Sequence, residues 1–270
     1  MINVLSAPRA RGAGLVIGTS TVAGRVLKKF IRTPQLVIGS LAQMALFLVC
    51  FRYVFGGAIV PSIGVPYVDY LVPGFIATGV LFAMIGSAVG MAEDLESGFV
   101  DRLRSLPVPR ASLLTGRALA DTLIVSLNLA VATAIGFLVG FRLHGSLLDG
   151  AAAFGLCVVL ALAFGWVFMT LGLFAKTAQA AQQMSMVVFP FTFLSSAYVP
   201  VATMPSWLRV FAENQPITPM VDAVRALTLG GAAPAILGHD AGFYVVRALT
   251  WAVVLVAVFA PIAVLRYRRS

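Results

Sequence analysis

Most of this chain is apolar, but one short segment is dense in charge. Residues 93–110, EDLESGFVDRLRSLPVPR, hold four acids and three arginines between two long apolar runs. The chemistry that such a segment offers is ion pairing and hydrogen bonding at a surface. The nature of that surface follows from the rest of the sequence.

Motifs for other chemistry are absent from the sequence. It contains no His-Glu-x-x-His, no Gly-x-Ser-x-Gly and no Cys and His cluster with metal-ligand spacing. The string nearest to a phosphate-binding loop, GLFAKT at 172–177, lacks the second glycine of that motif. We therefore predict that the chain is not an enzyme, has no catalytic residue and no metal site, and does not bind ATP by this motif.

The composition indicates an integral membrane protein. Of 270 residues, 60% are hydrophobic and only 11% are charged, whereas about a quarter of the residues in a soluble domain are charged. The mean hydropathy is +0.98. Apolar runs of roughly 20 residues, the length that crosses a bilayer as a helix, recur along the chain without the alternation of barrel strands. We predict an all-α fold with six spans: Leu36–Phe55, Tyr70–Ala92, Leu113–Phe141, Ala151–Ala175, Ala181–Val199 and Phe243–Leu265.

Basic residues set the expected orientation. Fourteen of the 19 Lys and Arg residues fall before the first span, in the second and fourth connections or in the C-terminal tail, and five fall on the other side. The positive-inside rule then places both termini in the cytoplasm. Because these residues are dispersed along membrane borders, and because no nucleic-acid-binding motif accompanies them, we expect no nucleic-acid partner.

Residues 1–34 form an expected cytoplasmic segment ahead of a single transmembrane domain at 35–270. In the segment, Val22, Val26 and Phe30 recur every fourth residue, and basic residues occupy other faces. This pattern predicts a helix that lies on the inner leaflet of the membrane. A flexible basic tail is the alternative.

The predicted spans contain few groups that could carry ions. Asp121 is the nearest candidate, but it lies one helical turn after Arg117, which favours a local ion pair over a proton relay. Without a nucleotide motif or a relay, uphill transport would require an external source of energy. A surface that receives this energy is therefore needed.

The charged segment has the features of such a surface. Phe99, Leu103 and Leu106 follow at i, i+4 and i+7, which predicts a short amphipathic helix, and Pro107 and Pro109 end it. Tethered to a span at each end, this helix can seat its apolar stripe in a groove of another protein. The alternative is a helix on lipid headgroups, for which four acids are a poor match.

Two stretches carry a resemblance to a known family. EDLESGFVDRLRSLPVPRASLLTGRALADTL resembles the segment that marks ABC-2 type permeases of the daunorubicin-resistance-like branch, and NQPITPMVDAVRAL at 214–227 resembles the sequence before their last helix. One departure is Asp101-Arg102, where Glu-Arg is common in the family. The resemblance implies a six-helix permease subunit that dimerises, with a homodimer expected, and binds two ATP-binding cassette subunits. ATP and Mg²⁺ then belong to the partner, and this chain holds no cofactor.

The resemblance also assigns the ATPase-coupling residues. They are Glu93, Asp94, Glu96, Gly98, Phe99, Asp101, Arg102, Leu103, Leu106, Pro107 and Arg110.

The region Pro200–Ala226 is too polar to span and is rich in proline, so we expect short helices there. This region resembles the segment of ABC-2 permeases that forms a re-entrant helical pair at the outer leaflet. A helix that breaks within the membrane must have its backbone buried in protein or lining a cavity. An outer gate is one interpretation of its polar residues, and the satisfaction of helix ends is another. The gate residues are Asn214, Pro216, Thr218, Asp222 and Arg225.

The predicted fifth span mixes polar and aromatic residues and contains Pro190, which could kink it. This mixture favours a partly wet, aromatic-lined substrate path, and helix packing through Ser and Thr is the alternative. In the second span Gly86 and Gly90 have the spacing that lets another helix approach. The expected path residues are Phe75, Phe82, Met84, Met184, Phe189, Phe193 and Tyr198.

The sequence therefore predicts the permease of an ATP-driven exporter in the cytoplasmic (inner) membrane of a bacterium. The expected cargo is a hydrophobic or amphipathic compound, such as a drug, an antibiotic or a lipid, and the chain contacts membrane lipid. A polysaccharide or glycolipid exporter, and a secondary transporter or structural subunit without an ATPase, remain alternatives.

Overall fold

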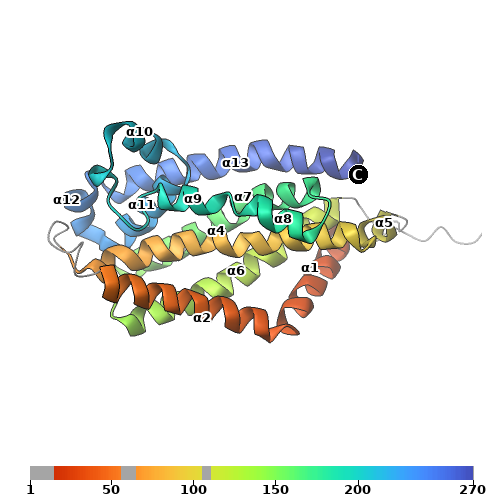
Figure 1. The fold of residues 1–270 in the computed structure, drawn as a ribbon, viewed down its shortest axis with the longest axis horizontal. Coiled ribbons are helices and arrows are strands. Elements are labelled where there is room, and N and C mark those ends of the chain that lie inside the picture. Colours follow the sequence, from red (N-terminus) through yellow and green to blue (C-terminus); the bar gives the residue numbers. More distant parts are fainter. Residues whose placement is uncertain (1–14, 56–64, 105–110, 270) are drawn as a thin grey trace, which may run out of the picture.

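A computed structural model describes residues 15–55, 65–104 and 111–269, and these ranges form a bundle of helices with no strand. Long helices run side by side along the molecule, and short helices lie at both ends (Figure 1). The helices are α1 (Leu15–Ile31), α2 (Pro34–Cys50), the π-helix η1 (Phe51–Phe55), α4 (Tyr67–Glu96), α5 (Phe99–Arg104), α6 (Ala111–Val139), α7 (Leu147–Phe174), α8 (Ala178–Ser185), α9 (Val188–Phe193), η3 (Val201–Thr203), α10 (Ser206–Asn214), α11 (Ile217–Leu229), η4 (Gly230–Ala232), α12 (Ala233–Leu237) and α13 (Ala241–Arg269).

The prediction of an all-α membrane protein is confirmed. Within the described ranges, five helical segments are long and apolar enough to cross a membrane. They are Tyr67–Glu96, Ser112–Val139, Leu147–Phe174, Ile217–Leu237 and Ala241–Arg268. Four of them coincide with predicted spans. The described helices do not reproduce the predicted count of six, because one of the five lies in the region expected to break and two predicted spans are not among them.

The predicted fifth span is not one continuous helix. α8 ends at Ser185 and α9 begins at Val188, so a turn interrupts the run. Pro190 accounts for the interruption, since it lacks an amide hydrogen and its ring excludes the carbonyl of Met186, four residues earlier. The two helices follow one another along α4 (Figure 1). The predicted first span is also altered, because α2 passes into the π-helix η1.

α4 and α7 form the centre of the bundle. α7 packs extensively on α4 and α13, and α4 also contacts α6, α8 and α11. The α4–α7 contact is close because Gly172 has no side chain; a Cβ there would lie 2.9 Å from Cβ of Met91. The expected helix contact at Gly86 is wrong within this chain, since a Cβ there would meet no atom within 4 Å. Gly90 instead faces the side chain of Arg117.

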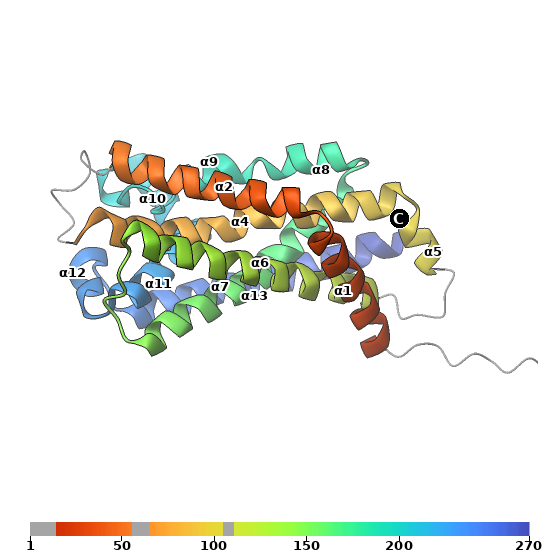
Figure 2. The ribbon, with the colours of Figure 1, turned by 90° about the horizontal axis from the view of Figure 1, so that it is seen from below.

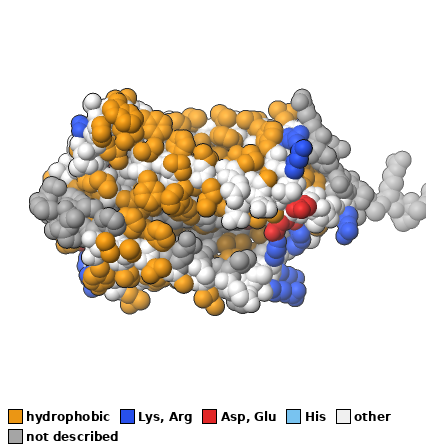
Figure 3. Space-filling view, viewed as in Figure 1, with side chains coloured by type: hydrophobic (Ala, Val, Ile, Leu, Met, Phe, Trp, Pro, Cys, Tyr) orange, Lys and Arg blue, Asp and Glu red, His pale blue; other side chains and the backbone are white. Residues whose placement is uncertain are grey.

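α1 crosses one end of the bundle and packs along α6 (Figure 2). Val22, one of the three stripe residues of this segment, is buried, and a Cβ on Gly116 of α6 would lie 2.9 Å from it. Part of the stripe therefore contacts protein. Lys and Arg side chains gather near the end that carries α5 and the C-terminus, and hydrophobic side chains cover much of the remaining face (Figure 3).

Candidate functional sites at the two ends of the bundle

Asp94, near the end of α4, joins three helices at the basic end. This residue is buried, and its side chain is 7% exposed. Oδ2 accepts a hydrogen bond from Nη1 of Arg117 on α6 at 2.6 Å, and Oδ1 lies 2.8 Å from Nη2 of Arg25 on α1. A buried carboxylate is stable as an anion only when cations or donors surround it, and two arginines meet that need here.

The ion pairs continue along α6. Nε of Arg117 lies 3.4 Å from Oδ2 of Asp121, within ion-pair distance but without a hydrogen bond, so the predicted local ion pair is confirmed. Ser87 of α4 donates to the same oxygen at 2.5 Å. At the surface, Lys29 of α1 pairs with Glu93 of α4. We call Arg25, Asp94, Arg117 and Asp121 the basic-end network.

The basic-end network also reaches α5. Gly98, with a φ of +67°, connects α4 to α5 through a left-handed backbone conformation that glycine adopts without strain. The guanidinium of Arg25 stands 3.6 Å from the ring centroid of Phe99, the first residue of α5. Glu96 accepts a hydrogen bond at 3.3 Å from the backbone of Ala178 in the first turn of α8.

The acids predicted to serve ATPase coupling therefore pair largely inside the chain. Glu93, Asp94 and Glu96 hold α1, α6 and α8. Arg102 is exposed, whereas the side chains of Asp101 and Leu103 are not described. Leu106, Pro107 and Arg110 lie outside the described residues. The sequence did not predict that Arg25 links Asp94 to Phe99. An acid as close to the end of a span as Asp94 nevertheless indicates a cationic partner.

Arg225 of α11 organises the opposite end of the bundle. Its side chain is 0% exposed. Nε donates to the carbonyl of Tyr70 at 3.0 Å, Nη1 to Oδ1 of Asp222 at 3.0 Å, and Nη2 to the carbonyls of Ser196 and Ala197 at 3.0 and 3.2 Å. The guanidinium also stacks over the Tyr70 ring at 3.6 Å. One cation thus joins α4, α11 and the chain after α9.

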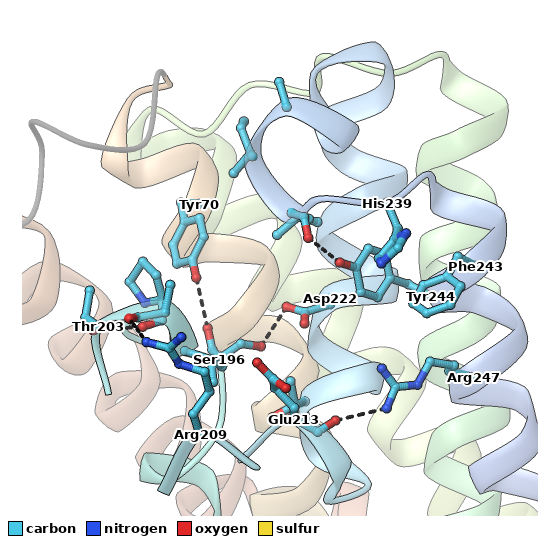
Figure 4. A pocket seen from close by; sticks show the side chains of 17 residues that line it. Tyr70, Ser196, Thr203, Arg209, Glu213, Asp222, His239, Phe243, Tyr244 and Arg247 are labelled. Atoms are coloured by element: carbon cyan, nitrogen blue, oxygen red, sulfur yellow. Dashed lines mark hydrogen bonds between the residues drawn. The ribbon is translucent and has the colours of Figure 1, made fainter. Parts of the chain in front are cut away.

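Two of the predicted gate residues meet at a pocket beside Arg225. Thr218 and Asp222 line this pocket of about 610 Å³, as does Ser196, which donates to Asp222 at 2.7 Å (Figure 4). Asn214 does not join them, because its side chain donates to the carbonyl of Val210 in its own helix. Pro216 directly precedes α11. Sequence reasoning missed the pocket residues Tyr70, Glu213 and Arg247, which come from three different helices and share no motif.

Five of the seven expected path residues meet in one aromatic row. Ring centroids are 5.9 Å apart for Phe82 and Phe189, 5.0 Å for Phe189 and Phe193, 5.0 Å for Phe193 and Tyr198, and 6.3 Å for Phe75 and Tyr198. Phe189 and Phe193 are each 43% exposed.

The other two expected path residues lie outside the row. Met184 is exposed on α8. Met84 is fully buried, with its sulfur 3.6 Å from where a Cβ on Gly165 of α7 would lie, so it does not border the exposed part of the row.

An apolar helical bundle with several helices long enough to cross a bilayer, and with ion-paired arginines at both ends, is typical of an integral membrane protein. The chain belongs to the ABC-2 type transporter family, whose family model matches residues 18–229.

Proteins of similar sequence support this family assignment. A daunorubicin resistance ABC transporter permease protein, DrrB1 of Streptomyces coeruleorubidus, is 31% identical over 270 residues, covering 99% of this chain and 92% of the relative. A probable doxorubicin resistance ABC transporter permease protein, DrrC of Mycobacterium tuberculosis (strain ATCC 25618 / H37Rv), is 27% identical over 222 residues, covering 80% and 78%. A putative transport permease, ycf38 of Pyropia yezoensis, is 26% identical over 210 residues, covering 75% and 71%. The predicted family is confirmed.

Proposed function

We propose that this chain is the transmembrane permease subunit of an ATP-binding cassette exporter. It moves a hydrophobic or amphipathic compound, such as a drug, an antibiotic or a lipid, out across the cytoplasmic membrane of a bacterium. Two copies of a separate cassette subunit bind ATP and Mg²⁺, and a second copy of this chain completes a homodimer. Family membership and the drug-resistance names of two relatives support this proposal.

The single observation that carries the coupling role is the attachment of α5 to the rest of the bundle. Arg25 touches Phe99 of α5 and, at the same time, the buried carboxylate of Asp94. Asp94 is bonded in turn to Arg117 of α6. Charge-assisted bonds are short and directional, so a displacement of α5 would be passed through Arg25 and Asp94 to α1, α4 and α6 together.

The proposed topology keeps six crossings with both termini in the cytoplasm. α2 and η1 together comprise 22 residues, or about 33 Å at 1.5 Å per residue, which matches the hydrocarbon thickness. α8 and α9 form one broken crossing along α4, and α10 and α11 form the re-entrant pair at the outer leaflet. The gathering of Lys and Arg near one end supports this orientation (Figure 3).

The aromatic row, which joins rings of α4 to rings of the fifth crossing, is the proposed substrate path. Phe189 and Phe193 lie side by side and remain partly exposed in a single chain. Exposed aromatic rings can stack against an apolar cargo that moves past them.

Substitution of Leu103 in α5 tests the coupling role. In the sequence pattern Leu103 is the centre of the apolar stripe, and an aspartate buried in a docking groove without a partner costs several kcal/mol. We expect Leu103→Asp to lose both export and stimulation of the co-expressed cassette ATPase, with normal insertion into the membrane. Gln179→Asp, an exposed position on α8 at the same end of the bundle, is the control and should keep both activities. Wild-type export by Leu103→Asp would show that α5 does not couple the two subunits.

A further inference from the structure

The end of α9 is held by a side chain from the junction between α10 and α11. Gln215 occupies this junction, directly after α10 ends at Asn214, and it is only 5% exposed. Its Nε2 donates to the carbonyl of Phe191 at 3.1 Å and to the carbonyl of Leu194 at 3.1 Å. One amide therefore ties α10 and α11 to the helix that carries Phe193 of the aromatic row.

The way in which α9 ends makes these carbonyls available. A helix leaves its last four carbonyls without a partner inside the helix. The amide of Ser195 donates to the carbonyl of Thr192 at 3.3 Å instead of to that of Phe191, so the last turn is of the tighter 3₁₀ type. Gln215 thus supplies the donors that a further turn of α9 would have supplied.

The two carbonyls also fix the orientation of the Gln215 amide. If the amide were turned by 180°, its oxygen would face two carbonyl oxygens to which it cannot donate. In the part of the chain that the structure describes, Oε1 is buried and has no hydrogen-bond partner. The two N–H groups of Nε2 therefore make the polar contact between this side chain and α9.

The rotation of α9 about its own axis depends on such contacts. α9 comprises only six residues, and a helix this short gains too few hydrogen bonds to be stable by itself. The ring centroid of Phe191 lies 5.8 Å from that of Phe211 on α10, and the centroid of Phe189 lies 5.9 Å from that of Phe82 on α4. Because side chains two positions apart on a helix point about 200° apart, α10 and Gln215 hold one side of α9 and leave the path rings on the other.

We propose that Gln215 is a positioning residue for export. Its two hydrogen bonds fix the rotation of α9 and thereby set the rings of Phe189 and Phe193 along the substrate path. A movement of α10 and α11 is passed through the same two bonds to the aromatic row, so the outer end of the bundle and the contact with the cargo change together. The proposal rests on the proposed export function and adds a residue to it.

Gln215→Met tests the proposal, because methionine has a similar length and donates no hydrogen bond. Gln215→Asn keeps the amide but is one methylene shorter, and it carries the test if the methionine variant does not fold. Gln183→Met makes the same change at an exposed position of α8 and is the matched control. The reporter is 4-fluorophenylalanine in place of Phe193, whose ring centroid lies 5.0 Å from those of Phe189 and Tyr198. Its fluorine NMR spectrum is recorded on the purified permease in nanodiscs.

We expect one fluorine resonance for the wild type and for Gln183→Met, because the neighbouring rings hold the reporter in one environment. Gln215→Met and Gln215→Asn should each give a second or a broadened resonance, since α9 then adopts more than one rotation. A residue that contributed only stability would lower the melting temperature and leave the spectrum of the folded protein unchanged. An unchanged spectrum of a folded Gln215 variant would therefore overturn the proposal.

ATP-dependent uptake of ethidium, an aromatic amphipathic cation, into inside-out vesicles with the co-expressed cassette subunit measures the effect on export. Gln215→Met should raise the half-saturating ethidium concentration about two- to tenfold, the size of a weakened aromatic contact, and leave the maximal rate nearly unchanged. In a Phe189→Ala/Phe193→Ala background the same change should have almost no further effect, because the rings through which Gln215 acts are gone.

The two measurements fail separately. Effects of Gln215→Met that are as large in the Phe189→Ala/Phe193→Ala background as in the wild type would overturn the proposal, since Gln215 would then act by another route. A wild type that takes up no ethidium with ATP would count against the export function, while the fluorine spectrum would still decide whether Gln215 positions α9. Normal uptake together with an unchanged spectrum would leave the exporter standing and refute the role of Gln215.

Discussion

The basic-end network makes a quantitative prediction at Asp94. Asp94→Asn removes the charge at nearly constant volume and leaves the guanidinium of Arg117, whose side chain is 6% exposed, with Asp121 as its remaining anionic neighbour. Breaking a buried ion pair by removing one partner costs about 3–5 kcal/mol. Since Asp121 stays within 3.4 Å, we expect the lower value of about 3 kcal/mol. At roughly 2–4 °C per kcal/mol, the melting temperature should fall by about 6–12 °C.

Thermal unfolding of the purified permease in detergent measures this shift at neutral pH, and the neighbouring acid provides the control. Glu93→Gln removes an ion pair whose two side chains are 61% and 42% exposed, which is worth about 0–1 kcal/mol, so its shift should stay below about 4 °C. Asp94→Asn/Arg117→Gln/Asp121→Asn should recover part of the loss, because it removes both buried carboxylates together with the cation between them, so no uncompensated buried charge remains. The reasoning is refuted if Asp94→Asn melts no lower than Glu93→Gln, or if the triple variant melts lower than Asp94→Asn alone.

Two further predictions use matched positions. Gly74→Ala should destabilise the chain strongly and lower its yield in the membrane, because the added Cβ would lie 2.7 Å from Nη2 of the buried Arg225 and closer still to a backbone carbonyl. Gly86→Ala in the same helix meets nothing within 4 Å and should be neutral or stabilising by about 0.5–1 kcal/mol. Equal melting temperatures of the two variants would contradict this prediction. In a variant without the two native cysteines, an impermeant thiol reagent added to intact cells should label Ser206→Cys and leave Gln179→Cys unlabelled, and the reverse pattern would overturn the proposed orientation.

Several features follow from local sequence patterns. The extents of α4, α6, α7 and α13 agree with the predicted spans to within a few residues, because a helix that crosses lipid must be apolar over its whole length. The pairing of Arg117 with Asp121 was predictable as well, since residues four apart on a helix are neighbours. The break at Pro190 also had a local signal, but a kink was predicted where the structure has a turn between two helices.

Other features depend on which helices cross. The sequence places acids at 93, 94 and 96 and basic residues on α1 and α6, but the spacing alone does not say which pairs form. Because α1 crosses α6, Lys29 forms an ion pair with Glu93 and Arg25 forms one with Asp94. Arg225 and the carbonyl of Tyr70 are 155 residues apart, yet they lie 3.0 Å from each other.

The sequence by itself thus determined the membrane class, the family and most of the long helices, because hydrophobicity and helical periodicity act over one or two turns. Only the tertiary structure decided the partners of Asp94 and Arg225, the burial of Met84 and the pocket beside Arg225. Each of these depends on the distance between helices that are far apart in the chain, and a charge in a low-dielectric interior takes whichever partner the packing of those helices brings within reach.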